Sequence, residues 1–173
     1  MRIFIFSLIS LIIIWLLSFF YFLNITDNVI NNRNITDAII VINPKKSNLN
    51  ISLQLLKAGY APFIYIISED NADDYSNYLK SQKIAPEQLI FSSQIQDDSE
   101  HQAISILKFL NKYSFKSIRL VADDIEIPRL MLELKHNLPI DIIIITHSIN
   151  SNKKFGAAFK EYIKYTYTLI TSF

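Results

Sequence analysis

The chain has 173 residues, of which 50% are hydrophobic and only 2 are glycine, and this composition excludes disordered, collagen-like and low-complexity proteins. Its 17 basic and 16 acidic residues give a formal charge of +1, so the sequence has no basic excess with which to hold a nucleic acid. Cysteine is absent, which excludes disulfides, thiolate metal ligands and a cysteine nucleophile.

Residues 3–23 form an apolar stretch that contains no charge, no proline and no glycine. About 20 such residues in a helix match the ~30 Å hydrocarbon core of a bilayer. A cleaved signal peptide, the alternative, has a shorter apolar core and ends in a small-residue cleavage site, whereas this stretch continues into the sequence NITD. We therefore predict a transmembrane anchor at residues 1–23, which contacts the bilayer through residues 3–23, and a polar tether at residues 24–36.

The charges that flank the anchor predict its orientation. Arg2 and the terminal amine lie on one side of it, and Asp27 and Arg33 lie on the other. The positive-inside bias favours a cytoplasmic N-terminus and an exported C-terminal domain. A domain that faces the cytosol is the alternative.

Residues 37–173 alternate short, β-branched apolar segments with segments of helical periodicity. Strands are expected at residues 37–42, 62–67, 89–91, 117–121 and 140–145. The last helix is expected at about residues 154–170, with its buried side formed by Phe155, Phe159, Tyr162, Ile163 and Thr166. This alternation predicts an α/β, Rossmann-like three-layer sandwich with a mostly parallel five-stranded sheet, preceded by one N-terminal transmembrane helix.

Acidic residues follow the fourth predicted strand, at the edge where parallel sheets bind ligands. Asp123, Asp124 and Glu126 could bind a divalent cation or act as acid and base, or they could simply stabilise the first turn of the next helix. Arg129 could bind an anion, or it could pair with Asp124 or Glu126. Asp124 and Glu126 are thus the candidate catalytic residues, and Asp123 and Arg129 are candidate ligand-binding residues.

Three further polar residues are candidates for ligand binding. Ser68 ends the second predicted strand, where it is either a nucleophile or an ordinary turn residue. Asp98 and Ser99 precede the helix that follows the third strand and either position a phosphate or metal or cap that helix. Three histidines without cysteine do not predict a zinc site, and without a Gly-rich phosphate loop the sequence identifies no cofactor.

The order and spacing of several segments resemble the SanA/YdcF/ElyC family of bacterial envelope proteins. LVADDIEIPR at residues 120–129 is similar to the family's LVTSxxHxPRA segment, and residues 78–90 are similar to its YL…GIP…I stretch. The other matching segments are residues 37–42, 55–62, 64–68 and 159–162. The resemblance implies a single-pass protein of the bacterial inner membrane with a periplasmic domain. It also implies a role in cell-wall, peptidoglycan or barrier biogenesis, with a phosphorylated or lipid-linked envelope precursor as partner.

The chain departs from this family at its polar positions. The Gly-rich turn after the first strand is Asn43-Pro44-Lys45, the Ser-Gly-Gly sequence is Ser68-Glu69-Asp70, and the histidine before the proline is Glu126. Proline removes an N–H group and restricts φ, so this turn cannot approach an anion as a glycine turn does. Two hypotheses follow: an envelope enzyme, in which Asp124, Glu126 and Arg129 converge, and a non-catalytic binding or scaffold domain.

Overall fold

A computed structural model describes residues 2–27, 32–42, 44–68, 75, 78, 82, 84–92, 99–151 and 155–171. Its sheet has five strands in the order β3-β2-β1-β4-β5, and all the pairings are parallel. The strands are β1 (Ala38–Ile42), β2 (Ile64–Ile67), β3 (Leu89–Phe91), β4 (Ser117–Asp123) and β5 (Ile143–Ile149). The predicted parallel α/β fold is confirmed.

The strand order places β1 at the centre of the sheet. Ile39 of β1 pairs with Ile64 of β2 on one side and with Arg119 of β4 on the other. From β1 the chain builds outward through β2 and β3, and it then returns to add β4 and β5 on the opposite side. The topological switch point, where ligands bind in open α/β sheets, therefore lies between the carboxyl ends of β1 and β4.

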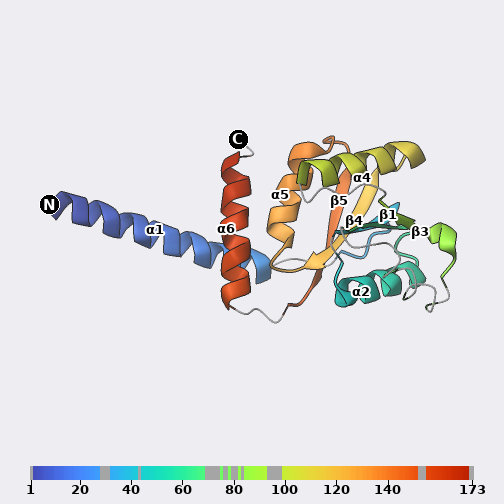
Figure 1. The fold of residues 1–173 in the computed structure, drawn as a ribbon, viewed down its shortest axis with the longest axis horizontal. Helices are drawn as coiled ribbons and strands as arrows, with labels where there is room; N and C mark the ends of the chain where they lie inside the picture. The colour runs from blue at the N-terminus through green and yellow to red at the C-terminus, as the bar shows by residue number, and fades with distance from the viewer. Residues whose placement is uncertain are drawn as a thin grey trace.

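Helices cover both faces of the sheet, which gives the predicted three layers (Figure 1). Helices α4 (Ser99–Tyr113) and α5 (Ile127–Asn137) pack on one face, and α2 (Lys46–Lys57) packs on the other. A short 3-10 helix, η1 (Pro86–Gln88), precedes β3. Because successive side chains of a strand point to opposite faces, Ile40 and Leu120 pack toward α4 and α5, whereas Ile39 and Val41 pack toward α2.

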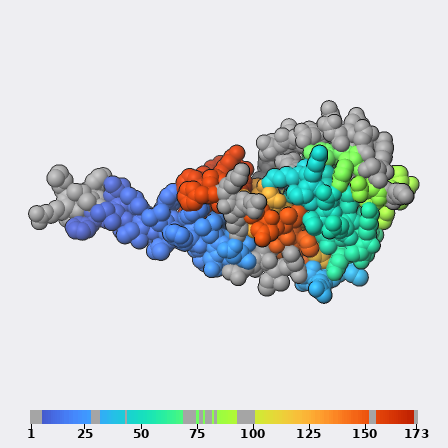
Figure 2. Space-filling view, turned by 90° about the horizontal axis from the view of Figure 1, so that it is seen from below, coloured from blue at the N-terminus to red at the C-terminus, as the bar shows by residue number. Residues whose placement is uncertain are grey.

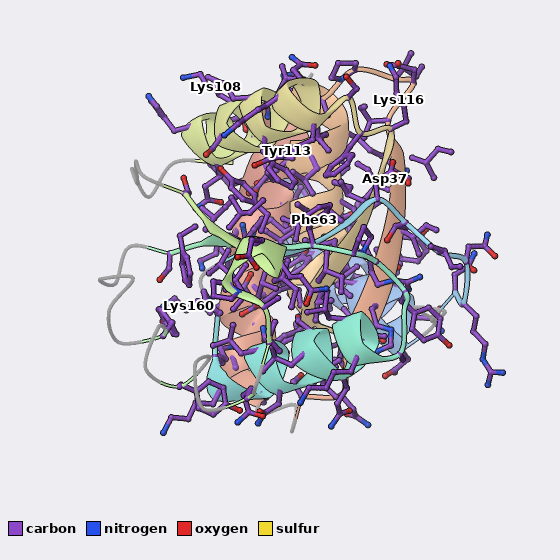
Figure 3. The ribbon with its side chains drawn as sticks, turned by 90° about the vertical axis from the view of Figure 1, so that its right-hand side faces the viewer. Asp37, Phe63, Lys108, Tyr113, Lys116 and Lys160 are labelled. Atoms are coloured by element: carbon purple, nitrogen blue, oxygen red, sulfur yellow. The ribbon has the colours of Figure 1, made fainter. Side chains whose placement is uncertain are left out.

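The amino edge of the sheet is closed by internal contacts. One carboxylate oxygen of Asp37 accepts hydrogen bonds from the Lys116 and Ser117 amides, at 2.8 and 2.7 Å, and from the Ser117 hydroxyl at 2.8 Å. Burial alone would raise the pKa of Asp37, but these hydrogen bonds lower it overall. Figure 3 shows Asp37 and Lys116 at the same end of the molecule, and nearby Phe63 stacks on Tyr113. These contacts stabilise the amino edge of the sheet.

The N-terminal helix α1 (Arg2–Asp27) projects beyond the body as a rod (Figure 2). By length and composition, its segment Phe6–Asp27 is apolar and long enough to cross a membrane, and only 11% of its most apolar window is buried. It is therefore unlike the core helix of a soluble domain. The helix runs four residues past the predicted end of the anchor at residue 23, so the first part of the expected tether is helical.

The last helix, α6 (Phe155–Thr171), stands between α1 and α5 (Figure 1). Tyr162 is 1% exposed, as expected for its buried side, but Phe155 and Ile163 are 72% and 46% exposed, so their predicted burial is wrong. The reason is that α6 packs against two helices, α1 and α5, and these cover a narrower part of its surface than a sheet would. The fifth strand also begins later than predicted, at Ile143, because residues 139–142 form a turn.

Candidate functional site

Three charged side chains meet at the switch point. Lys45 follows β1, Asp123 is the last residue of β4, and Glu126 lies in the turn before α5. The Lys45 Nζ atom lies 2.5 Å from Asp123 Oδ2 and 3.0 Å from Glu126 Oε1. Two of the sequence-predicted residues are thus brought together, and Lys45 is the partner that was missed. A lysine three residues after the first strand is the signal that could have identified it, once the strand order was known.

The charge of this cluster argues against anion binding and against Lys45 as a general base. Burial alone would lower the pKa of Lys45, but hydrogen bonds and charges from Asp123 and Glu126 raise it overall. Lys45 therefore stays protonated and cannot serve as a general base. With two carboxylates and one ammonium, the cluster carries a net negative charge, which repels a phosphate group.

Asp124 is buried and serves the loop structure. Its Oδ1 atom accepts hydrogen bonds from the Ile125 amide at 2.8 Å and from the Ser151 hydroxyl and amide at 2.5 and 3.3 Å. Its own amide donates to the Ile149 carbonyl at 3.0 Å. Asp124 thus joins the turn after β4 to the end of β5, in the manner typical of aspartate in turns.

Arg129 binds carboxylates on the helices rather than at the sheet edge. Its Nε atom donates to Glu161 Oε2 at 3.0 Å, and its Nη1 atom donates to both carboxylate oxygens of Glu133 at 2.9 and 3.0 Å. Lys164 and Thr168 complete the network, with hydrogen bonds to Glu161 at 2.9 Å and to Glu133 at 3.3 Å. This network ties α5 to α6.

The expected convergence of Asp124, Glu126 and Arg129 is not observed. Glu126 pairs with Lys45 and Arg129 pairs with Glu133 and Glu161, so the alternative in which Arg129 pairs with Asp124 or Glu126 is also wrong. The physical reason is the partners that other elements supply: Lys45, which follows β1, binds Glu126, whereas Glu161 of α6 and Glu133 of α5 bind Arg129.

Of the three remaining predicted site residues, Ser68 is the one whose surroundings the structure describes. Ser68 directly follows β2 and is buried. Helix α4 begins at Ser99, and Asp98 lies outside the described residues. Within the described part of the chain, no group of three or more histidine, aspartate or glutamate residues is placed to hold a metal ion.

A buried arginine on the α2 side of the sheet was missed by the sequence prediction. Arg119 of β4 is 0% exposed, and its Nη1 atom donates to the Asn32 carbonyl at 2.7 Å. Its Nη2 atom donates to the Asn34 carbonyl, and its guanidinium lies 5.2 Å from the centroid of the Tyr60 ring. The segment that follows α1 is therefore held on the sheet by a charged side chain. A lone arginine within an apolar strand is the signal that could have found it.

His147 of β5 makes the stability of this region dependent on pH. Burial, together with the nearby positive charge of Arg119, lowers the pKa of His147. The unfolded chain therefore binds more protons below about pH 6.5, so the free energy of unfolding should fall as the pH drops from about 6.5 toward 5. Carboxylates whose pKa is lowered in the fold, such as Glu161, change the free energy of unfolding only at lower pH. Thermal unfolding in detergent should show this slope in the wild type and a smaller slope in His147→Asn; equal slopes would contradict the assignment.

Comparisons with known proteins identify relatives but no family. No protein-family model matches the chain. An uncharacterized protein of Rickettsia conorii is 26% identical over 165 residues, which cover 94% of this chain and 96% of the relative. An uncharacterized protein of Rickettsia prowazekii is 25% identical over 171 residues, which cover 98% of both chains. These matches take in nearly the whole chain, so α1 and the α/β body are aligned together.

Proposed function

We propose that this chain is a single-pass inner-membrane protein of the bacterial cell envelope, whose periplasmic α/β body binds or positions an envelope component and catalyses no reaction. The role in envelope biogenesis is what the resemblance to the SanA/YdcF/ElyC family implies, and the two bacterial relatives are consistent with a bacterial source. The observation that carries the proposal is the aromatic contact between α1 and α6.

This contact makes the anchor part of the folded body. Phe19 and Phe22 of α1 are 5% and 0% exposed, and both pack on Tyr162, with ring centroids 5.2 and 5.7 Å apart. The Tyr162 hydroxyl also donates to the Trp15 carbonyl at 3.3 Å. Cleavage of α1 as a signal peptide would uncover these α6 rings, which favours an anchor that is retained.

The proposal that the body catalyses no reaction is supported by the candidate side chains, which already have partners within the protein. Arg129 binds two carboxylates, Asp124 fixes Ser151, and Lys45 is bound by Asp123 and Glu126. A general acid or base needs hydrogen-bond access to its substrate, and an anion clamp needs free donors. An enzyme that acts on an envelope precursor is the second candidate, favoured by the position of two carboxylates, Asp123 and Glu126, at the switch point.

Complementation tests the proposal against this alternative. In a bacterial strain that lacks the gene, we expect increased permeability to large hydrophilic antibiotics, and we expect the wild type, Lys45→Ala and Glu126→Gln to restore the barrier equally. A body released by a cleavable signal peptide in place of residues 1–14 keeps the contacts of Trp15, Phe19 and Phe22 with α6 and should fail because it lacks the anchor. A C-terminal alkaline phosphatase fusion should be active, as a periplasmic domain requires.

Each contrary result has a distinct meaning. Loss of complementation by Lys45→Ala at unchanged protein level would favour the enzyme. A deletion strain with normal permeability would remove the envelope role. An inactive phosphatase fusion would place the body in the cytosol.

A further inference from the structure

Helix α6 has an apolar surface that the protein does not cover. Ile163, Tyr167 and Ile170 are 46%, 69% and 71% exposed. At about 100° per residue they fall within about 60° of the helix circumference. Glu161 and Thr168, which bond to Arg129 and Glu133 of α5, lie on the opposite side of the helix. The apolar arc formed by Ile163, Tyr167 and Ile170 therefore faces away from α5.

The apolar arc faces the side on which α1 projects. In Figure 1 the body and α5 lie on one side of α6, and the free part of α1 lies on the other. Phe155 is 72% exposed and its ring centroid lies 5.6 Å from that of Phe19 in α1, so it extends the apolar surface of α6 to the anchor. The exposed apolar surfaces of α1 and α6 thus meet at Phe155.

The position of α6 along the length of α1 indicates what covers the apolar arc. Helix α6 contacts α1 at Trp15, Phe19 and Phe22. At the same level α1 exposes Leu16, Leu17, Phe20 and Tyr21, each between 44% and 66% exposed. From Arg2 to Trp15 the helix rises only about 20 Å, whereas the hydrocarbon core is ~30 Å thick. An anchor that spans the bilayer therefore needs the hydrocarbon to extend to the level of α6.

We propose that α6 is an interfacial helix that lies in the bilayer surface, with its apolar arc at the boundary of the acyl chains. The inference rests on the proposed function in one respect, that α1 spans the membrane. Amphipathic helices lie about 5–10 Å deep in this boundary. Added to the rise of about 20 Å from Arg2 to Trp15, this depth brings the length of α1 within the hydrocarbon close to the ~30 Å that a span requires. The bilayer would then hold the body through two crossed helices, which prevents the body from swinging about a single anchor.

The charged residues that border the arc fit this placement. Lys160 and Lys164 lie next to the Tyr167 side of the arc, and both are exposed. The Lys160 side chain projects outward in Figure 3. The stem of Lys160 would lie along the apolar surface while its ammonium group reaches toward lipid phosphates, whereas the ammonium group of Lys164 is bound to Glu161 at 2.9 Å.

The absence of native cysteine permits a direct test on the full chain. Single cysteines at Ile163, Tyr167 and Ile170 would be labelled with an environment-sensitive fluorophore, and the protein reconstituted in vesicles of phosphatidylethanolamine and phosphatidylglycerol with and without brominated lipid. Leu11→Cys in α1 is the control for the membrane span, and Lys108→Cys on α4 is the control for the exposed body. We expect the bromine to quench the three α6 probes several-fold more than the Lys108 probe.

The controls separate failure of this inference from failure of the proposed function. Quenching at Leu11 without quenching on α6 overturns the interfacial helix and leaves the span intact. Absence of quenching at Leu11 as well overturns the span itself. Probes on α6 whose emission shifts with protein concentration but not with brominated lipid would show that a second copy covers the arc, which also overturns the proposal.

Discussion

Replacement of Arg129 by alanine is expected to lower the free energy of unfolding by about 3–5 kcal/mol, because it leaves buried carboxylates without their cation. Glu133 and Glu161 are 9% and 7% exposed, and Arg129 donates to both. Burial alone would raise the pKa of Glu161, but Lys164 and Arg129 lower it overall, so Arg129→Ala removes one of the two cations that stabilise this carboxylate. Thermal unfolding of the full chain in detergent, followed by circular dichroism, measures the loss.

Two matched variants show whether the loss arises from the network. The triple variant Arg129→Met, Glu133→Leu, Glu161→Leu should recover most of the stability, since a buried ion network can be replaced by apolar side chains at little cost. Lys116→Met removes a lysine from an ion pair with Asp141 in which both side chains are exposed, at 70% and 58%, so we expect almost no loss of stability. Similar losses for Arg129→Ala and Lys116→Met would falsify the structural role assigned to Arg129.

The fold could be predicted from the sequence because its signals are local. Strands that are buried on both faces, such as Ala38–Ile42 and Ile64–Ile67, have continuous apolar sequences that are readable without knowledge of their neighbours. The helical period of residues 155–171 was equally visible. The period shows that a helix has an apolar side, but it does not show which element covers that side. The burial of Phe155 was therefore predicted wrongly.

The candidate site was less predictable because its contacts join segments that are distant in the sequence. Asp123 and Glu126 were found from their position after a strand, but Lys45 lies 78 residues from Asp123 and meets it only because β1 and β4 are neighbours. Arg129 and Glu133 are four residues apart on one helix, a pair that helical spacing can suggest. Glu161 comes from another helix, and no local pattern connects it to Arg129.

Arg119→Ala is expected to release the segment that follows α1 and to lower the free energy of unfolding by about 3 kcal/mol, since hydrogen bonds to charged groups contribute ~1.5–3 kcal/mol each. The guanidinium binds the carbonyls of Asn32 and Asn34, which flank Arg33. Arg33 is exposed and is a cleavage site for trypsin. In the wild type this backbone is held on the sheet and should resist the protease. Limited trypsin digestion of Arg119→Ala should cut after Arg33 several-fold faster, and the additional variant Arg33→Gln should abolish that cut.

Arg119→Met separates the hydrogen bonds from the packing. Methionine keeps much of the contact with the Tyr60 ring but cannot donate to either carbonyl, so cleavage after Arg33 should accelerate as in the alanine variant while less stability is lost. Removal of the positive charge should also raise the pKa of His147, because Arg119 is one of the two causes that lower it. NMR titration of the His147 ring measures this shift. An unchanged cleavage rate together with an unchanged His147 titration would show that Arg119 is not what holds residues 32–34 on the sheet.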